Sequence, residues 1–140
     1  MIRGLFFSLI LSSIIGCQSN SLIQEVELPL ATIKKVVTDN LKGGLRSTST
    51  NQREFYSQYY PVHTKDNHVK LRAYQIVKIL GDRRPYNVEA FVQLQQNKSE
   101  TEYTDVGIDH RASQTFREKI KVELAKSRGD HDVIDQFRAF

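Results

Sequence analysis

Two stretches in the middle of the chain alternate apolar and polar residues. In residues 69–79 the apolar positions are Val69, Leu71, Ala73, Val77 and Ile79, and in residues 86–94 they are Tyr86, Val88, Ala90, Val92 and Leu94. A period of two is typical of a strand with one buried face and one face in water. Because only residues 81–85 separate the stretches, and these contain glycine and proline, the pattern predicts an antiparallel hairpin.

Apolar spacings of three and four predict a helix on each side of this hairpin. The first stripe consists of Leu30, Ile33, Val37 and Leu41, and the second of Ala112, Phe116, Ile120 and Leu124. The first helix should cover residues 29–42, with Pro29 as its first residue and a glycine pair after its end. The second should be capped by Asp109 or Ser113 and end at Gly129, before a last short helix.

Two further strands complete the expected sheet. The aromatic residues of one stretch, Phe55, Tyr56, Tyr59 and Tyr60, suit a pleated, half-buried surface, and residues 103–108 form a second candidate strand. Helices and a sheet with matching apolar faces pack as two layers. The sequence therefore predicts the α+β class, a small two-layer domain. Its antiparallel sheet of three to four strands should pack against an N-terminal and a C-terminal helix.

The first 16 residues have the three parts of a secretory leader. Arg3 supplies the positive start, residues 4–15 are mostly apolar, and Gly16 is a small residue before the predicted cut. The apolar stretch is much shorter than the roughly 20 residues that a helix needs to cross a bilayer. We therefore expect residues 1–16 to be a cleaved signal peptide.

The end of this leader resembles the lipobox of bacterial lipoproteins. Ile14-Ile15-Gly16-Cys17 has its order of two aliphatic residues, a small residue and cysteine, and the alternative is an ordinary signal peptide with a chance cysteine. The resemblance implies that Cys17 carries a diacylglyceryl group and, in many bacteria, a further acyl chain such as palmitate. Two or more chains anchor a protein stably to a membrane.

The resemblance also implies a location and a domain organisation. In double-membraned bacteria, Gln18 directly after the cysteine, rather than aspartate, implies export to the periplasmic face of the outer membrane. Residues 17–27 should then form a lipidated tether, and residues 28–140 a single folded domain. The membrane itself, reached through the lipid on Cys17, is the first expected partner.

Composition and charge narrow the remaining possibilities. The chain has 140 residues, 39% of them hydrophobic and 26% charged, which is ordinary for one globular domain. Its 20 basic and 16 acidic residues form no clustered basic stripe, so we expect no nucleic-acid partner. Cys17 is the only cysteine, and lipidation would leave no thiol for a disulfide, a nucleophile or a zinc–thiolate site.

The residues that carry chemistry show no catalytic motif. His63, His68 and His110 are the histidines from which a metal-dependent hydrolase would draw its ligands, but no two of them have the i, i+4 spacing of a metalloprotease helix. The chain also lacks a glycine-rich phosphate loop and a Gly-x-Ser-x-Gly elbow. We therefore expect no enzymatic activity, no metal and no cofactor.

Two functions remain as the main hypotheses. The first, by analogy with other small lipoproteins, is an envelope scaffold or assembly factor that binds a partner protein. Its contact surface would be the polar face of the hairpin with Phe91 and the turn residues Arg83 and Arg84, or an unpaired strand edge. The second is a periplasmic ligand-binding module in which the aromatic residues Phe55, Tyr56, Tyr59 and Tyr60 line a groove between helix and sheet. An open apolar pocket would favour this second hypothesis, and a filled core the first.

Overall fold

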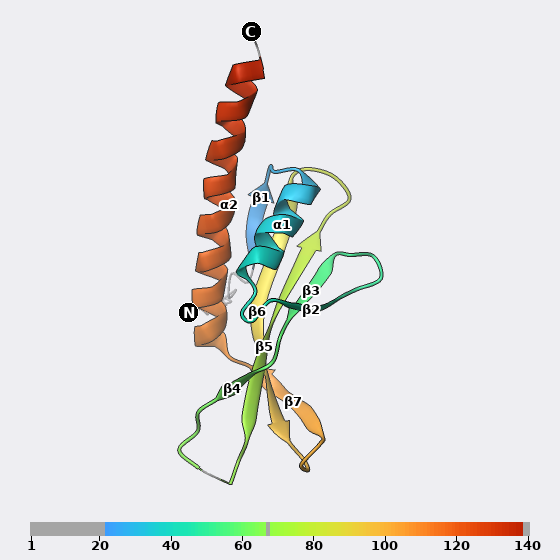
Figure 1. Cartoon of the computed structure of the whole chain (residues 1–140), viewed down its shortest axis with the longest axis vertical. Coiled ribbons are helices and arrows are strands. Elements are labelled where there is room, and N and C mark those ends of the chain that lie inside the picture. Colours follow the sequence, from blue (N-terminus) through green and yellow to red (C-terminus); the bar gives the residue numbers. More distant parts are fainter. Residues whose placement is uncertain (1–21, 67, 139–140) are drawn as a thin grey trace, which may run out of the picture.

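Two long strands form the centre of one antiparallel sheet (Figure 1). The computed structural model describes residues 22–66 and 68–138. Within them β5 (Leu71–Leu80) and β6 (Tyr86–Asn97) pair continuously, from Leu71 opposite Gln96 to Leu80 opposite Asn87. The hairpin predicted from the alternating pattern is confirmed, because its two strands bury the same alternate residues that are apolar in the sequence.

Each central strand changes its outer neighbour halfway along its length. The start of β6 pairs with β1 (Leu22–Val26), and its end pairs with β7 (Tyr103–Ile108). The end of β5 pairs with β3 (Glu54–Ser57), and its start pairs with β4 (Tyr60–Val62). A further strand, β2 (Leu45–Thr48), borders β3, so the sheet has seven strands in the described part of the chain.

The two helices, α1 (Leu30–Asn40) and α2 (His110–Arg138), pack on one face of this sheet. The core between them includes Ile33 and Val37 of α1, Phe116, Ile120 and Leu124 of α2, and Ala73, Val77, Ile79, Val88, Ala90 and Val92 of the central strands. Figure 1 shows that β4 and β7 extend beyond the helices at one end, while α2 continues past the sheet at the other. Neither described helix combines the length and the apolar character needed to cross a bilayer.

Two buried serines occupy the points where the central strands change neighbour. The backbone N–H of Val92 donates to Ser113 Oγ at 2.8 Å, and the N–H of Gln75 donates to Ser57 Oγ at 2.8 Å. Ser57 is fully buried and Ser113 is 2% exposed. Each hydroxyl also donates to a backbone carbonyl, of Gln58 or of Asp109, so its hydrogen-bonding capacity is used on both sides. Gln75 and Val92 pair with each other, but no outer strand reaches either of them, so the serines satisfy N–H groups that would otherwise be buried without an acceptor.

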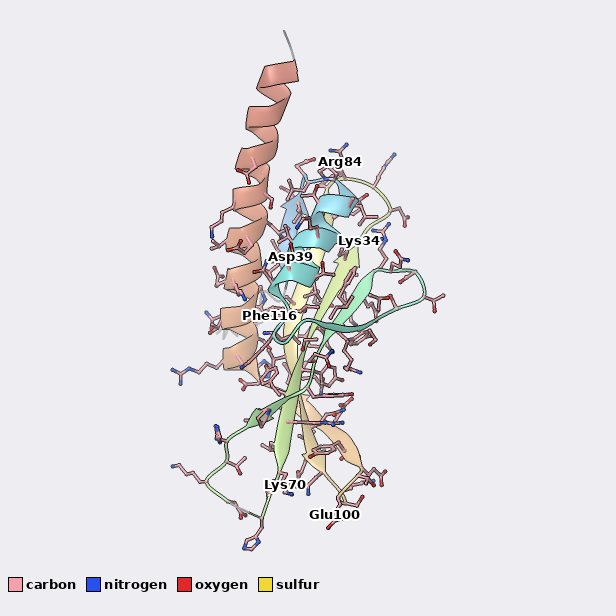
Figure 2. The ribbon with its side chains drawn as sticks, viewed as in Figure 1. Lys34, Asp39, Lys70, Arg84, Glu100 and Phe116 are labelled. Atoms are coloured by element: carbon pink, nitrogen blue, oxygen red, sulfur yellow. The ribbon has the colours of Figure 1, made fainter. Side chains whose placement is uncertain are left out.

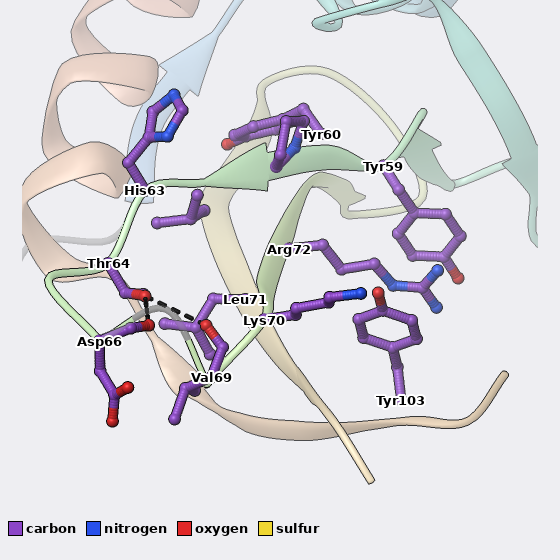
Figure 3. A pocket seen from close by; sticks show the side chains of 12 residues that line it. Tyr59, Tyr60, His63, Thr64, Asp66, Val69, Lys70, Leu71, Arg72 and Tyr103 are labelled. Atoms are coloured by element: carbon purple, nitrogen blue, oxygen red, sulfur yellow. Dashed lines mark hydrogen bonds between the residues drawn. The ribbon is translucent and has the colours of Figure 1, made fainter. Parts of the chain in front are cut away.

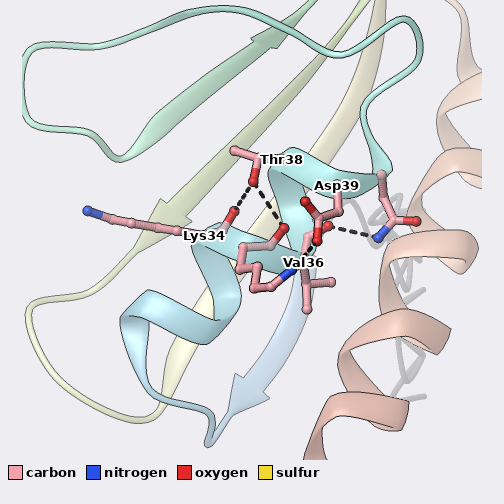
Figure 4. A network of polar contacts seen from close by, with 6 residues as sticks. Lys34, Val36, Thr38 and Asp39 are labelled. Atoms are coloured by element: carbon pink, nitrogen blue, oxygen red, sulfur yellow. Dashed lines mark hydrogen bonds and ion pairs between the residues drawn. The ribbon is translucent and has the colours of Figure 1, made fainter.

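The outward face of α1 is polar and bonded within the helix (Figure 4). Thr38 Oγ1 donates to the carbonyl of Lys34 at 2.9 Å, and Asn40 Nδ2 donates to that of Val36 at 2.8 Å. A Lys35–Asp39 ion pair, 2.6 Å between Nζ and Oδ2, lies on the same exposed surface. Exposed pairs of this kind contribute little to stability, so α1 is held in place mainly by its buried stripe.

The predicted fold class is wrong in the number of strands and in the element that begins the fold. Within residues 22–66 and 68–138 the sheet has seven strands rather than three to four, and β1 precedes α1 in the segment assigned to the tether. In β1 a bulge with Glu25 at a φ of 54° puts Ile23 and Val26 on the same buried side, which breaks the period of two. All four residues of β2 are exposed, and β4 has only three residues, so neither carries a periodic apolar signal.

The predicted ends of the helices also need correction. The glycine pair after α1 adopts the expected positive φ values, 74° at Gly43 and 88° at Gly44, but Pro29 precedes the first helical residue rather than being it. Asp109 caps α2 by accepting the N–H of Ala112 at 3.0 Å. The helix does not end at Gly129 and continues as one element to Arg138, because Gly129 does not take the left-handed conformation that ends a helix.

We predict that Ser113→Ala and Ser57→Ala each lower the free energy of unfolding by about 1–3 kcal/mol, since each leaves a buried N–H without its acceptor. In Ser113→Ala the better helix propensity of alanine offsets part of this loss. Urea unfolding of the purified protein measures the change. The matched control is Ser47→Ala on the exposed strand β2, for which we expect a change within about 0.5 kcal/mol. Equal stabilities for all three variants would contradict the assigned role of the two hydroxyls.

Candidate functional site

The sheet face turned away from the helices carries the other set of alternating side chains. On β5 these are Arg72, Tyr74, Ile76 and Lys78, and their register partners on β6 are Gln95, Gln93, Phe91 and Glu89. Tyr74 and Ile76 are only 8% and 6% exposed, although neither belongs to the core under the helices. Side chains of this face therefore cover one another, without a helix over them in the described part of the chain.

Arg72 and Tyr74 form a cluster with four side chains from neighbouring segments, and we call these six the tyrosine–arginine face. It consists of Arg46, Tyr56, Tyr59, Arg72, Tyr74 and Tyr103. The Tyr59 and Tyr74 rings meet edge to face at 5.5 Å between centroids. The Arg46 guanidinium lies over both, 4.2 Å from the Tyr59 ring and 5.3 Å from the Tyr74 ring. Cation–π contacts of this kind hold an otherwise flexible arginine in one position.

Arg72 is the most constrained member of the face. Its guanidinium lies between two rings, 3.7 Å from the centroid of Tyr59 and 3.8 Å from that of Tyr103. Its Nε donates to Gln95 Oε1 at 2.8 Å, and Gln95 Nε2 in turn donates to Asp105 Oδ1 at 2.8 Å. Because Tyr103 comes from β7 and Tyr59 from the segment between β3 and β4, Arg72 connects elements on both sides of the central hairpin.

A cavity of about 450 Å³ lies beside Arg72 at the end of the sheet that extends beyond the helices (Figure 3). Tyr59, Tyr60, Val62, Thr64, Asp66, Val69, Lys70, Leu71, Arg72 and Tyr103 are among the residues that line it. Thr64 Oγ1 is within hydrogen-bonding distance of two backbone carbonyls of the adjoining loop, at 2.7 Å from Asp66 O and 3.1 Å from Val69 O. The volume of this cavity falls within the range of small-molecule sites in proteins.

Three tyrosines near these sites have raised pKa values. The hydrogen bond that Tyr56 donates to Glu54 Oε2 at 2.6 Å, followed by burial and the charge of Glu54, raises the pKa of Tyr56 to about 12. Burial, followed by the charge of Asp105, raises the pKa of Tyr74. The pKa of Tyr60 is raised by burial and then by the charge of Asp109. These hydroxyls therefore stay neutral and can donate hydrogen bonds at neutral pH.

The four aromatic residues predicted to line one groove lie in different places. Phe55 is 3% exposed in the core, and Tyr56 and Tyr59 belong to the tyrosine–arginine face. Tyr60 packs against the core on the helix side of the sheet, where it lines the cavity and a second hollow of about 470 Å³ beside Phe116. Alternation along β3 separates neighbouring residues onto opposite faces, so these four residues do not form a single helix–sheet groove.

Of the three residues predicted as a contact surface, Phe91 lies apart from Arg83 and Arg84. Phe91 is half-buried on the tyrosine–arginine side of the sheet, with Lys78 Nζ 5.6 Å from its ring centroid. Arg83 and Arg84 are exposed in the turn of the hairpin, and Arg84 Nη1 donates to the carbonyl of Glu27 at 3.5 Å. Figure 2 shows Arg84 at the end of the molecule opposite to Lys70.

Sequence reasoning missed Arg46, Arg72, Tyr74 and Tyr103. Arg72 and Tyr74 occupy positions of β5 that the alternating pattern assigns to water. The available signal was the aromatic side chain of Tyr74 at such a position, because the solvent-exposed face of a strand usually carries shorter polar side chains. Arg46 and Tyr103 join the cluster only through strand pairing, which no local pattern reveals.

The remaining predicted residues lie elsewhere or outside the described part. His63 lines the cavity, while His68 and His110 are exposed. Among the side chains that the structure describes, no three from His, Cys, Asp and Glu gather as metal ligands would. Cys17 and the leader lie outside the described residues.

Comparison with known proteins gives no family assignment. No protein-family model matches the chain, and the search of curated proteins also finds no match. A function for this chain therefore has to rest on its own residues.

We predict that Glu54→Gln moves the pKa of Tyr56 from about 12 toward the ordinary tyrosine value near 10, because the variant removes the charged acceptor. NMR of ¹³Cζ-labelled tyrosine measures this pKa. A raised folded-state pKa stabilises the fold fully below the unfolded-state value near pH 10, and this stabilisation is lost as pH rises toward 12. The stability gap between wild type and Tyr56→Phe should therefore narrow between pH 10 and 12. A gap that stays constant would contradict the role of the Tyr56–Glu54 bond.

Proposed function

We propose that the chain is a lipid-anchored, non-enzymatic protein of the bacterial cell envelope, a scaffold or assembly factor that binds another envelope protein through the tyrosine–arginine face. The observation that carries the proposal is a sheet face that no described helix covers and that is nevertheless ordered by stacked rings and guanidinium groups. Tyrosine and arginine dominate the energetic centres of protein interfaces, because both bring large contact area and directional donors.

The order of this face supports binding. Arg46 and Arg72 are each held by aromatic rings, and each Nε also donates a hydrogen bond, Arg46 to the Ser57 carbonyl and Arg72 to Gln95. Side chains that are fixed before association lose less conformational entropy when a partner binds. A protein partner therefore meets a preformed surface.

The charge of this face favours a protein over a nucleic acid. On this side of the sheet the basic residues are Arg46, Arg72 and Lys78. They are matched by three acidic residues on the same side, Glu54, Glu89 and Asp105. Binding to nucleic-acid phosphates needs a basic stripe without such compensation. Mixed charge around an aromatic centre is instead typical of protein contacts.

The proposed anchor would hold this surface close to a membrane. The described part of β1 begins at Leu22, so a tether from Cys17 would span at most five residues rather than eleven. Fully extended, five residues reach about 17 Å. The folded body would thus remain within one domain diameter of the bilayer that holds the lipid, which suits the assembly of a membrane-bound complex.

The cavity supports ligand binding as the second candidate function. Its lining combines aromatic, apolar and cationic side chains in a volume of about 450 Å³. It lies beside the tyrosine–arginine face rather than between helix and sheet, so it takes only Tyr59 and Tyr60 from the aromatic residues singled out in the sequence.

We predict that Cys17→Ser moves the protein from the membrane fraction to the soluble fraction, because it removes the only thiol that can carry a lipid. Cell fractionation and mass spectrometry of the N-terminal peptide measure this change. Membrane sedimentation that survives the substitution, or an unmodified Cys17 in the wild type, would contradict the anchor.

We predict that a photo-crosslinking residue at Tyr103 or Phe91 captures a protein partner in intact membranes, since both positions lie on the proposed contact side. Immunoblotting of the irradiated cells detects the adduct. The matched control is the same residue at Val122, which is 50% exposed on α2 and lies away from this side. Adducts of equal yield from all three positions, or from Val122 alone, would contradict the assigned surface.

A further inference from the structure

The guanidinium of Arg72 has hydrogen-bond donors that the protein does not use. Rings lie against both of its faces, and Gln95 accepts from its Nε. Its two Nη groups make no hydrogen bond and no ion pair with another residue whose side chain is described, in the ranges 22–66 and 68–130. The flat faces are therefore occupied, while the planar edge with its four N–H donors remains available.

Lys70 brings a second cation to the same cavity. Its backbone is fixed by two hydrogen bonds with Asn97, from Lys70 N to Asn97 Oδ1 at 3.0 Å and from Asn97 N to Lys70 O at 3.1 Å. Lys70 precedes Arg72 by two residues, so the two side chains leave the strand on the same side. Figure 3 shows them extending in the same direction, with the Asp66 carboxylate pointing to the opposite side.

The structure shows no acidic partner for this pair of cations among the residues it describes. Asp66 is the acidic residue in the cavity lining. Its Oδ1 accepts a hydrogen bond from the backbone N–H of His68 at 2.9 Å, which stabilises the loop that contains both residues. Asp105 is bonded to Gln95 and reaches Arg72 only through that amide. Two neighbouring cations without a counterion favour an anion from outside the protein.

We propose that this cavity binds a single carboxylate attached to a small organic group, with the carboxylate on the Arg72 edge and Lys70 and the attached group beside the Tyr59 and Tyr103 rings that flank Arg72. A planar guanidinium edge matches the two oxygens of a carboxylate in a bidentate pair. Two cations and the single carboxylate of Asp66 leave one net positive charge in the lining, which suits a monoanion better than a doubly charged phosphate.

The aromatic part of the lining indicates what the carboxylate is attached to. The Tyr59 and Tyr103 rings lie on the same side of β5 as Arg72, whereas Val62 and Leu71 line the cavity from the helix side. The volume of about 450 Å³ accommodates a few apolar carbon atoms beside the carboxylate. This chemistry is shared by the C-terminal residue of a peptide and by a small aliphatic acid.

The inference extends the proposed function, because the cavity shares Tyr59, Arg72 and Tyr103 with the tyrosine–arginine face. The two proposals can fail separately. Crosslinking reports whether a protein touches the face, whereas the titration described next reports whether the cavity recognises a carboxylate.

Isothermal titration calorimetry of the protein purified from membranes in a nonionic detergent tests the inference. The probes are acetyl-Ala-Ala-Leu with a free carboxylate, the same peptide as its amide, and pentanoate with its neutral match pentanamide. We expect at least one acid to bind with a millimolar or lower Kd and its amide to bind at least tenfold more weakly. Binding of the peptide acid alone identifies a peptide C-terminus as the source, and equal binding of pentanoate identifies a small acid.

Matched variants separate recognition from folding. Arg72→Lys keeps the charge but loses the planar edge, and we expect it to weaken acid binding at least tenfold. Arg53→Lys changes an arginine that lies against the Tyr86 ring, outside the cavity lining and the tyrosine–arginine face, and we expect a change within twofold. Lys70→Gln, at an exposed position that folding does not require, should weaken binding about threefold, and Lys78→Gln on the same strand face should not.

Three results would overturn the inference. The first is acids and amides binding equally or not at all at millimolar concentration. The second is inorganic phosphate binding more tightly than either acid. The third is acid binding that stays unchanged in both Arg72→Lys and Lys70→Gln.

Discussion

The structure depends on keeping every backbone N–H of two long central strands hydrogen-bonded where their neighbours change. Short strands flank β5 and β6 on both sides, and they leave Gln75 and Val92 without an outer strand partner. Ser57 and Ser113 fill these two gaps from the end of β3 and from α2. A buried N–H without an acceptor costs free energy comparable to the net gain of several hydrogen bonds, so two hydroxyls allow one sheet to carry two sets of edge strands.

This arrangement divides the sheet into two halves with different surroundings. One half, with β1 and β3, lies under the helices and holds the core, and Ser113 connects the start of α2 to the middle of β6. The other half, with β4 and β7, extends past the helices, so its side chains are covered by one another rather than by a second layer (Figure 1). Arg72 lies where β4, β5 and β7 come together, and the cavity beside it exists because no helix fills that end.

The strand predicted at residues 103–108 is confirmed as β7, and the other elements predicted correctly are those whose own residues pack on a helix-covered face. The hairpin, the stripe of α1 and the stripe of α2 as far as Leu124 each show a period that burial imposes. β1, β2 and β4 were missed because a bulge, full exposure or a length of three residues removes that period. Gly129 was taken for a helix end, although a glycine inside a helix costs only about 1 kcal/mol and the helix continues.

The sequence by itself determined the period of the central hairpin, the two amphipathic helices, the single cysteine and the expectation of a lipid anchor, because each depends on residues close together in the chain. Only the tertiary structure decided which aromatic residues share a surface. Phe55 and Tyr56 are neighbours in sequence yet lie on opposite sides of a strand, while Arg46, Arg72 and Tyr103 come from distant segments and meet around Tyr59. Strand pairing sets these distances, and pairing between distant strands leaves no periodic trace in the sequence.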